Sequence, residues 1–290
     1  MPDYVILTDS SADLSAEMVR EAGVTVLPLS FTIQGETYEN TPDNREMDPA
    51  LFYDMLRAGE LATTSAVNVA AYTDAVEPLL QAGKDVLILA FSSGLSTTCN
   101  SAEVAAEELR ERYPQRKLYV VDTLCASLGQ GLLVWLAARE QKKGRTIEEV
   151  RDWAETHKQA VCHQFTVQDL KFLKRGGRIT ATTAVLGSML QIKPVLHVDN
   201  DGKLMTVAKA RGRRAALKAL VDRMEQTAID LRDQTVFISH GDCLEDAQLV
   251  AQLVKDRFGV KDVYMNYVGP VVGAHAGPGV LALFYVGVER

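Results

Sequence analysis

The sequence lacks several features that would place a 290-residue chain in a specialised class. It has no run near the ~18 apolar residues that a membrane-spanning helix needs. Its four cysteines are scattered without CxxC spacing, which argues against a zinc module, and we predict no metal site. Acidic residues outnumber basic ones by 38 to 31, and the net charge of -7 argues against general binding to nucleic acids or anionic membranes.

Other absences concern location and organisation. Residues 1–6 show no basic region followed by a long apolar segment, so we expect no signal peptide and a reduced, cytoplasmic location. There is no internal repeat and no linker rich in proline, glycine or serine. The length suits one large or two ordinary domains, and we place a boundary near residue 160, giving residues 1–160 and 161–290.

The two halves differ in their hydrophobic patterns. The first half alternates predicted strands (4–8, 24–33, 86–91, 118–121) with predicted helices (15–22, 47–58, 70–80, 102–113, 127–143, 147–160). The second combines a hairpin at residues 192–208 with helices at 213–229 and 245–258 and strands at 236–239, 263–268 and 281–288. This order predicts an α/β fold in which a largely parallel sheet with flanking helices precedes an α+β domain.

The strand at residues 86–91 runs directly into a cluster of hydroxyls around one glycine, Ser92 to Thr98. A strand-to-helix corner in an open α/β sheet offers backbone N–H groups and a positive helix end to a ligand. The corner itself carries no lysine, arginine or carboxylate, which favours an anion held by hydrogen bonds. The plainer interpretation is that these serines and threonines only cap and turn the chain.

Two further polar segments are expected to converge on this edge. Residues 62–66 form a second hydroxyl cluster, which we expect to cap a helix, and Asp122-Thr123 follow the strand at 118–121. Because the carboxyl ends of parallel strands share one edge, such loops can meet there.

Two segments place titratable side chains next to glycines. Residues 269–279 hold four glycines and two prolines around His275, which predicts a constrained loop presenting a hydrogen-bond donor rather than an incidental surface connector. Arg175 and Arg178 flank Gly176-Gly177. This segment is either a site that binds a carboxylate or phosphate or an ordinary solvated basic turn.

Two more patterns leave alternatives open. Residues 203–223 hold seven basic residues and one acid, which indicates either a solvated helix face or a docking patch for an acidic partner. Residues 125–129 resemble a G-x-S-x-G nucleophile elbow with cysteine in the first position, so Ser127 with His275 could form an acyl hydrolase. Without that first glycine, a serine that starts a helix is the preferred interpretation.

The chain resembles the DegV family, the fatty-acid-binding proteins of bacterial fatty acid kinase systems, in six ordered segments: residues 64–65, 92–96 with 100–102, 122–123, 173–179, 193–196 with Gly202, and 269–279. The resemblance covers nearly the whole chain. It implies two α/β domains with a long-chain fatty acid between them and no other cofactor. It also implies a protein without catalytic residues of its own, which presents the acid to a kinase subunit that makes acyl phosphate for phospholipid synthesis. A binding protein for a small anionic metabolite is the other non-enzyme alternative.

The resemblance also assigns roles to individual residues. Thr64 and Ser93, helped by the Gly94 N–H, would bind the carboxylate, with His275 beside them. The surrounding head-group region would include Ser65, Ser92, Arg175 and Arg178, and the kinase-docking surface would include Arg211 and Arg213. The chain departs from the family where Gln-Pro is replaced by Ala66-Val67 and where Gly-Thr-Tyr is replaced by Thr97-Thr98-Cys99.

Overall fold

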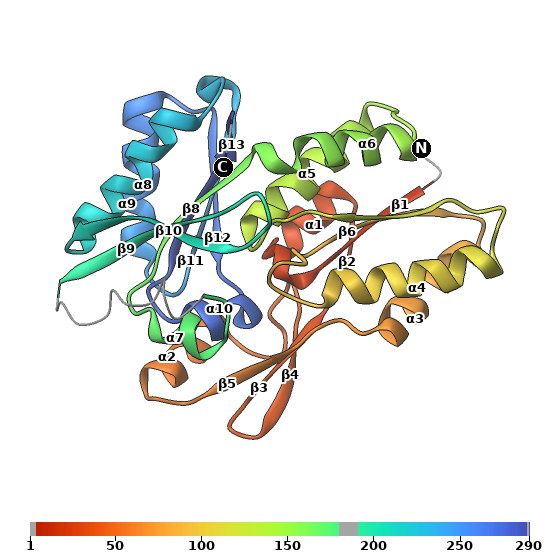
Figure 1. Cartoon of the computed structure of the whole chain (residues 1–290), viewed down its shortest axis with the longest axis horizontal. Helices are drawn as coiled ribbons and strands as arrows, with labels where there is room; N and C mark the ends of the chain where they lie inside the picture. The colour runs from red at the N-terminus through yellow and green to blue at the C-terminus, as the bar shows by residue number, and fades with distance from the viewer. Residues whose placement is uncertain (1–3, 180–190, 289) are drawn as a thin grey trace.

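The computed structural model describes residues 4–179, 191–288 and 290 (Figure 1). Residues 1–3, part of the segment in which we expect no signal peptide, lie outside this description. A four-stranded parallel sheet forms the centre of the first half, as predicted, in the order β2-β1-β6-β7. Its strands are β1 (Tyr4–Asp9), β2 (Thr25–Leu27), β6 (Asp85–Ala90) and β7 (Leu118–Asp122).

Helices cover both faces of this sheet. Successive side chains of a strand point to opposite sides, so one strand contributes to two cores. Leu87 and Leu89 of β6 pack in the cluster formed with α1 (Ala16–Ala22), α5 (Leu128–Lys142) and α6 (Ile147–His157). Val86 and Ile88 pack on the other side, in the cluster formed with α3 (Val69–Gln81) and α4 (Thr98–Arg112). Burial on both faces explains why β6 is a continuous apolar run.

A six-stranded mixed sheet forms the second half, in the order β10-β9-β8-β13-β11-β12. Only the pair β11–β12 is parallel among its strand pairs. One face packs on α8 (Arg213–Thr227) and α9 (Leu244–Phe258). The strands are β8 (Val161–Thr166), β9 (Ile192–Val198), β10 (Leu204–Arg211), β11 (Thr235–His240), β12 (Asp262–Tyr267) and β13 (Leu281–Val286).

Helix α5 lies between the two large sheets. Residues 128–134 are all buried, so the first two turns have no side that faces solvent, while Arg139 and Lys142 are exposed at the other end. A helical segment that is buried all round is part of a core rather than of a surface. It packs on the parallel sheet and also contacts β8, β11 and β13 of the mixed sheet (Figure 1).

A small antiparallel sheet, in the order β4-β3-β5, lies beside the cavity described below. Its strands are β3 (Leu29–Ile33), β4 (Glu36–Asn40) and β5 (Ala62–Ser65), and the helices near it are α2 (Pro49–Arg57), α7 (Lys171–Arg175) and α10 (Pro270–Ala276). The described part of the chain also contains the short 3-10 helices η1 (Ser10–Ala12), η2 (Lys158–Ala160) and η3 (Leu231–Asp233).

Three local predictions were wrong. Residues 24–33 are two strands in different sheets, because Pro28, which has no N–H to donate, separates β2 from β3. Residues 62–66 do not cap a helix: they contribute β5, and Asn68 caps α3. Residues 269–279 contain helix α10 rather than only a loop, with Pro270 at its first turn and Gly277 at positive φ after its end.

The sequence patterns also missed β4, β8 and α7. The mixed sheet begins at Val161, while the boundary near residue 160 itself remains a prediction. No helix within the described residues has the length and hydropathy to cross a bilayer.

Candidate functional site

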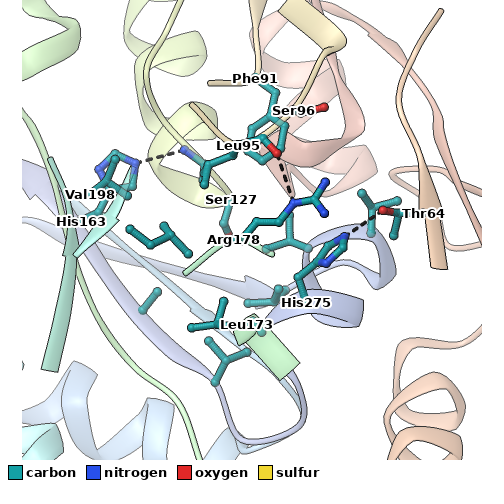
Figure 2. Close-up of a pocket in the computed structure, with 18 of the residues that line it drawn as sticks. Thr64, Phe91, Leu95, Ser96, Ser127, His163, Leu173, Arg178, Val198 and His275 are labelled. Atoms are coloured by element: carbon teal, nitrogen blue, oxygen red, sulfur yellow. Dashed lines mark hydrogen bonds between the residues drawn. The ribbon is translucent and has the colours of Figure 1, made fainter. Parts of the chain in front are cut away.

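A cavity of about 440 Å³ lies between the segment after β6, helix α10 and strands of the mixed sheet (Figure 2). Its volume is within the usual ~300–1,000 Å³ range of small-molecule sites. Most of its lining is apolar, including Phe91, Phe165, Val280, Ala282 and Phe284. The space therefore suits a ligand with a large hydrocarbon portion.

A hydrogen-bonded pair of side chains forms one polar part of the lining. Thr64 on β5 and His275 on α10 lie 2.8 Å apart, measured from Oγ1 to Nε2. Both helix α10 and strand β5 are short elements that contact each other, so the pair is held by the small sheet (Figure 2). These two residues, distant in sequence, are brought together as the resemblance implied.

His275 is uncharged at neutral pH. Burial, together with the nearby positive charges of Arg178 and Arg175, lowers the pKa of its imidazole to about 4. Gly176 packs against the other side of the ring, where a Cβ atom would collide with Nδ1 of His275. Gly176 thus lets the backbone approach the imidazole closely, whereas a Cβ at Gly177 would meet no atom within 4 Å.

The two predicted arginines occupy different environments. Arg178 lines the cavity, and its Nε donates to the carbonyl oxygen of Leu95 over 3.2 Å. Burial lowers its pKa, and it forms no ion pair with any described residue. Arg175 is exposed and lies 4.9 Å over the ring of Phe172, outside the lining. Arg178 is therefore the arginine placed to attract an anion into the cavity.

The corner after β6 has fewer free donors than its sequence suggested. The N–H of Ser93 donates to Asp122 Oδ1 over 3.1 Å, and that of Gly94 donates to Ser92 Oγ over 3.2 Å. The expectation that Ser93 and Gly94 have spare backbone N–H groups was therefore wrong, whereas Asp122 does converge on this corner as predicted, and Arg178 also reaches it.

Gly94 has a different role in this corner. A Cβ atom at Gly94 would lie 2.7 Å from the carbonyl oxygen of Asp201 and 2.8 Å from that of Gly202. Ser92 Oγ donates to the same Gly202 carbonyl over 2.8 Å. The glycine and the buried serine therefore seal the corner against the β9–β10 turn, and neither lines the cavity.

A second polar cluster reaches the cavity from the start of α5. Ser127 Oγ lies 2.5 Å from Oδ2 of Asp13 and 2.9 Å from Oγ of Ser239. Ser127 has φ 53° and ψ −145°, a strained backbone for a residue other than glycine, and its side chain does not cap the helix. Ser127 thus stands at the start of α5, as the preferred interpretation had it, but its side chain does not cap the helix, and the strained turn forms without the first glycine.

This geometry does not support the hydrolase alternative. His275 Nε2 bonds to Thr64, whereas Ser127 bonds to Asp13 and Ser239. The other histidine in the lining, His163, accepts the Ala126 N–H at its Nε2 over 3.2 Å and so lacks a free lone pair there. Neither histidine is paired with Ser127 as a general base would be.

The cavity thus contains some of the predicted residues and several that were missed. Of the predicted residues it is lined by Thr64, Ser65, Ser93, Arg178 and His275, but not by Ser92, Gly94 or Arg175. Ser96 and Thr97 belong to the predicted hydroxyl corner and also line the cavity, whereas His163 and Ser239 were not predicted. His163 had no metal-ligand spacing, and Ser239 sits within an ordinary buried strand, so no local pattern marked either one.

Both departures from the family pattern border this site. Ala66 and Thr97 line the cavity. The residues that follow them in sequence, Val67, Thr98 and Cys99, are buried and do not line it. Within the described residues there is no group of histidine, cysteine and acidic side chains that could hold a metal ion.

Comparison with known proteins assigns the fold to a family. A family model described as an uncharacterised protein of the DegV family matches residues 3–288. The chain belongs to the DegV family. A DegV domain-containing protein of Clostridium perfringens is 44% identical over 287 residues, which cover 99% of this chain and 98% of the relative. The family resemblance of the sequence is thereby confirmed.

Solved structures of DegV proteins share the whole architecture. One is described as showing fatty acid binding of a DegV family protein from Thermus thermophilus, with a TM-score of 0.88, 29% identity and coverage of 99% of this chain and 100% of that chain. Another is DegV, a fatty acid binding protein from Bacillus subtilis, with a TM-score of 0.85, 28% identity and the same coverage. The predicted α/β fold class with a second sheet-containing domain is confirmed.

Proposed function

We propose that this chain binds a long-chain fatty acid in the cavity and presents its carboxyl group to a separate kinase subunit. The observation that carries the proposal is an apolar cavity with the Thr64–His275 pair and Arg178 in its lining, in a fold whose solved relatives are described as fatty acid binding. Each buried CH₂ of a ligand contributes ~0.8 kcal/mol, so the hydrocarbon chain supplies most of the affinity. A small anionic metabolite would leave this apolar surface uncovered.

The carboxylate would be held by hydroxyl groups rather than by a charge clamp. A neutral His275 that donates from Nε2 to Thr64 Oγ1 leaves the threonine hydroxyl hydrogen free for a carboxylate oxygen. Ser93 offers a second hydroxyl from the corner, and Ser65 and Arg178 complete the head-group region. Such donors leave an oxygen of the acid free to attack a phosphoryl donor on the kinase, which would form the acyl phosphate for phospholipid synthesis in the cytoplasm.

We expect Thr64→Val to weaken fatty acid binding about tenfold, because it removes a hydrogen bond to a charged group while keeping the side-chain shape. Isothermal titration of delipidated protein with palmitate would measure this loss. The methyl ester of palmitate should lose less affinity than palmitate in Thr64→Val, because its uncharged carbonyl oxygen accepts a weaker hydrogen bond. Thr63→Val is the matched control, since Thr63 is exposed on the same strand and does not line the cavity. Absence of palmitate binding to the wild type would contradict the proposed function.

The kinase-docking surface remains a prediction. Its two arginines have different environments in the structure. Arg211 is exposed at the end of β10. Arg213 Nε lies 2.8 Å from Asp246 Oδ2, an ion pair that links α8 to α9. A substitution of Arg213 would therefore disturb the packing of these helices as well as any docking surface.

We expect Arg211→Glu to reduce phosphorylation of the bound fatty acid by the kinase subunit more than about tenfold, because like charges across an interface repel. Fatty acid binding should be unchanged. Lys255→Glu, on the exposed surface of α9 far along the helix from Asp246, makes the same change in net charge and should retain phosphorylation. Equal rates for the two variants would exclude Arg211 from docking.

A further inference from the structure

The cavity contains a polar cluster that the proposed carboxylate site does not use. Ser127 and Ser239 both line it, and behind them lies Asp13, which also accepts the Gly269 N–H over 3.0 Å. Ser239 is fully buried on β11, which lies between β13 and β12 of the mixed sheet. Figure 2 shows Ser127 on a part of the lining separate from the Thr64–His275 pair.

Counting hydrogen bonds shows that this cluster has unused capacity facing the cavity. With Asp13 ionised, the Ser127 hydroxyl donates to Asp13 and the Ser239 hydroxyl donates to Ser127, which leaves both lone pairs of Ser239 free. With Asp13 protonated, the chain of donors reverses and the Ser239 hydrogen is left free. Within the described residues, Ser127 is the only hydrogen-bond partner of the Ser239 hydroxyl.

The backbone of Ser127 points to the same conclusion. Its positive φ is sterically costly for serine, and strained residues of this kind persist where the surroundings hold them at a site. The strain turns the hydroxyl away from the helix end that it could have capped and towards Asp13 and Ser239. The cluster is thus positioned by the fold rather than left over from it.

The chemistry of the cluster selects the kind of ligand group that fits. A methylene opposite Ser239 leaves a buried polar group unmatched, which is unfavourable. A carboxylate would be repelled by ionised Asp13. A hydroxyl group both donates and accepts, so it matches Ser239 in either protonation state of Asp13.

We propose that Ser239, held by Ser127 and Asp13, recognises a hydroxyl group on the hydrocarbon chain of the ligand, so that the cavity prefers hydroxylated fatty acids. This inference rests on the proposed function, because it assumes that a fatty acid occupies the cavity. It names a substrate class within the fatty acids and makes Ser239 a specificity-determining residue.

The test compares stearate with a panel of monohydroxystearates that differ in hydroxyl position, all titrated against the delipidated full chain. At least one member should bind about tenfold more tightly than stearate, the effect of one well-placed buried hydrogen bond. Ser239→Ala should reduce this ratio to about one, because it weakens binding of the preferred hydroxystearate and removes the unmatched hydroxyl that opposes stearate. Ser239→Cys, which keeps the volume and hydrogen-bonds poorly, should do the same and guards against a packing effect of alanine.

Thr166→Val is the matched control, since it removes a buried hydroxyl from the same sheet but not from the cavity lining. It should keep the wild-type preference. Stearate binding without preference for any hydroxystearate, or a preference that survives in both Ser239 variants, overturns this inference alone. Failure of every acid, stearate included, overturns the proposed function and the inference together.

Discussion

Ala282→Trp is expected to weaken binding of stearate more than about 100-fold. Ala282 is a buried residue of β13, between β8 and β11, and its small side chain faces the cavity. An indole ring there would displace roughly four methylene groups of the ligand, at ~0.8 kcal/mol each. The lost contribution of about 3 kcal/mol corresponds to roughly 200-fold in affinity.

A chain-length series separates this effect from damage to the carboxylate site. Calorimetric titration from octanoate to stearate should show wild-type affinity rising about fourfold per CH₂. The affinity of Ala282→Trp should level off at the length that no longer fits, with octanoate little changed. Ala215→Trp, at an exposed position on α8, should behave as wild type. Equal loss for octanoate and stearate would contradict this account, and melting temperatures would show whether the variant is folded.

Asp13→Asn is expected to remove a large pH dependence of stability. Burial raises the pKa of Asp13 to about 7, with the negative charge of Asp9 adding to the effect. In the unfolded chain the pKa is ~3.9. Between these values the folded protein keeps a proton that the unfolded chain has released. The contribution of Asp13 is therefore complete below about pH 4, falls as pH rises, and is lost above about pH 7.

The expected size of this change is about 4 kcal/mol, since each pH unit counts for ~1.4 kcal/mol. Buried His275 acts in the opposite direction, because its pKa is lowered to about 4 and its neutral form is lost in the unfolded chain below about pH 6.5. Only the difference between wild type and Asp13→Asn isolates the aspartate. Urea unfolding at pH values from 4 to 8 would measure it, and two parallel curves would contradict the prediction.

Sequence patterns predicted the centre of the parallel sheet because β1 and β6 are buried on both faces and therefore read as nearly continuous apolar runs. They failed at short elements whose conformation depends on neighbours. Residues 62–65 carry little apolar signal and become β5 only by pairing with β3. Residues 270–276 form a helix in spite of their glycine content, where proline begins it and contacts with α2, α7 and β5 support it.

The site was predictable only where its chemistry was concentrated in motifs. Thr64, Ser93, Arg178 and His275 belong to segments of unusual composition, and all four line the cavity. Ser239 lies in a strand that reads as ordinary core, and its pairing with Ser127 is a long-range contact. The sequence also did not show which backbone donors are already used. The Gly94 N–H was expected to be available to a ligand, but it donates to Ser92 Oγ.

The position of helix α5 between the two large sheets limits how a ligand can enter or leave. Separating the sheets would expose the apolar surface of α5 to water, at ~25 cal/mol for each Å². The helices at the cavity edge, α7 and α10, have five and seven residues against fifteen in α5, so a shift of either would expose less surface. Local movement of the cavity rim therefore costs less free energy than a hinge motion between the two halves. The two halves can stay packed together while one ligand replaces another.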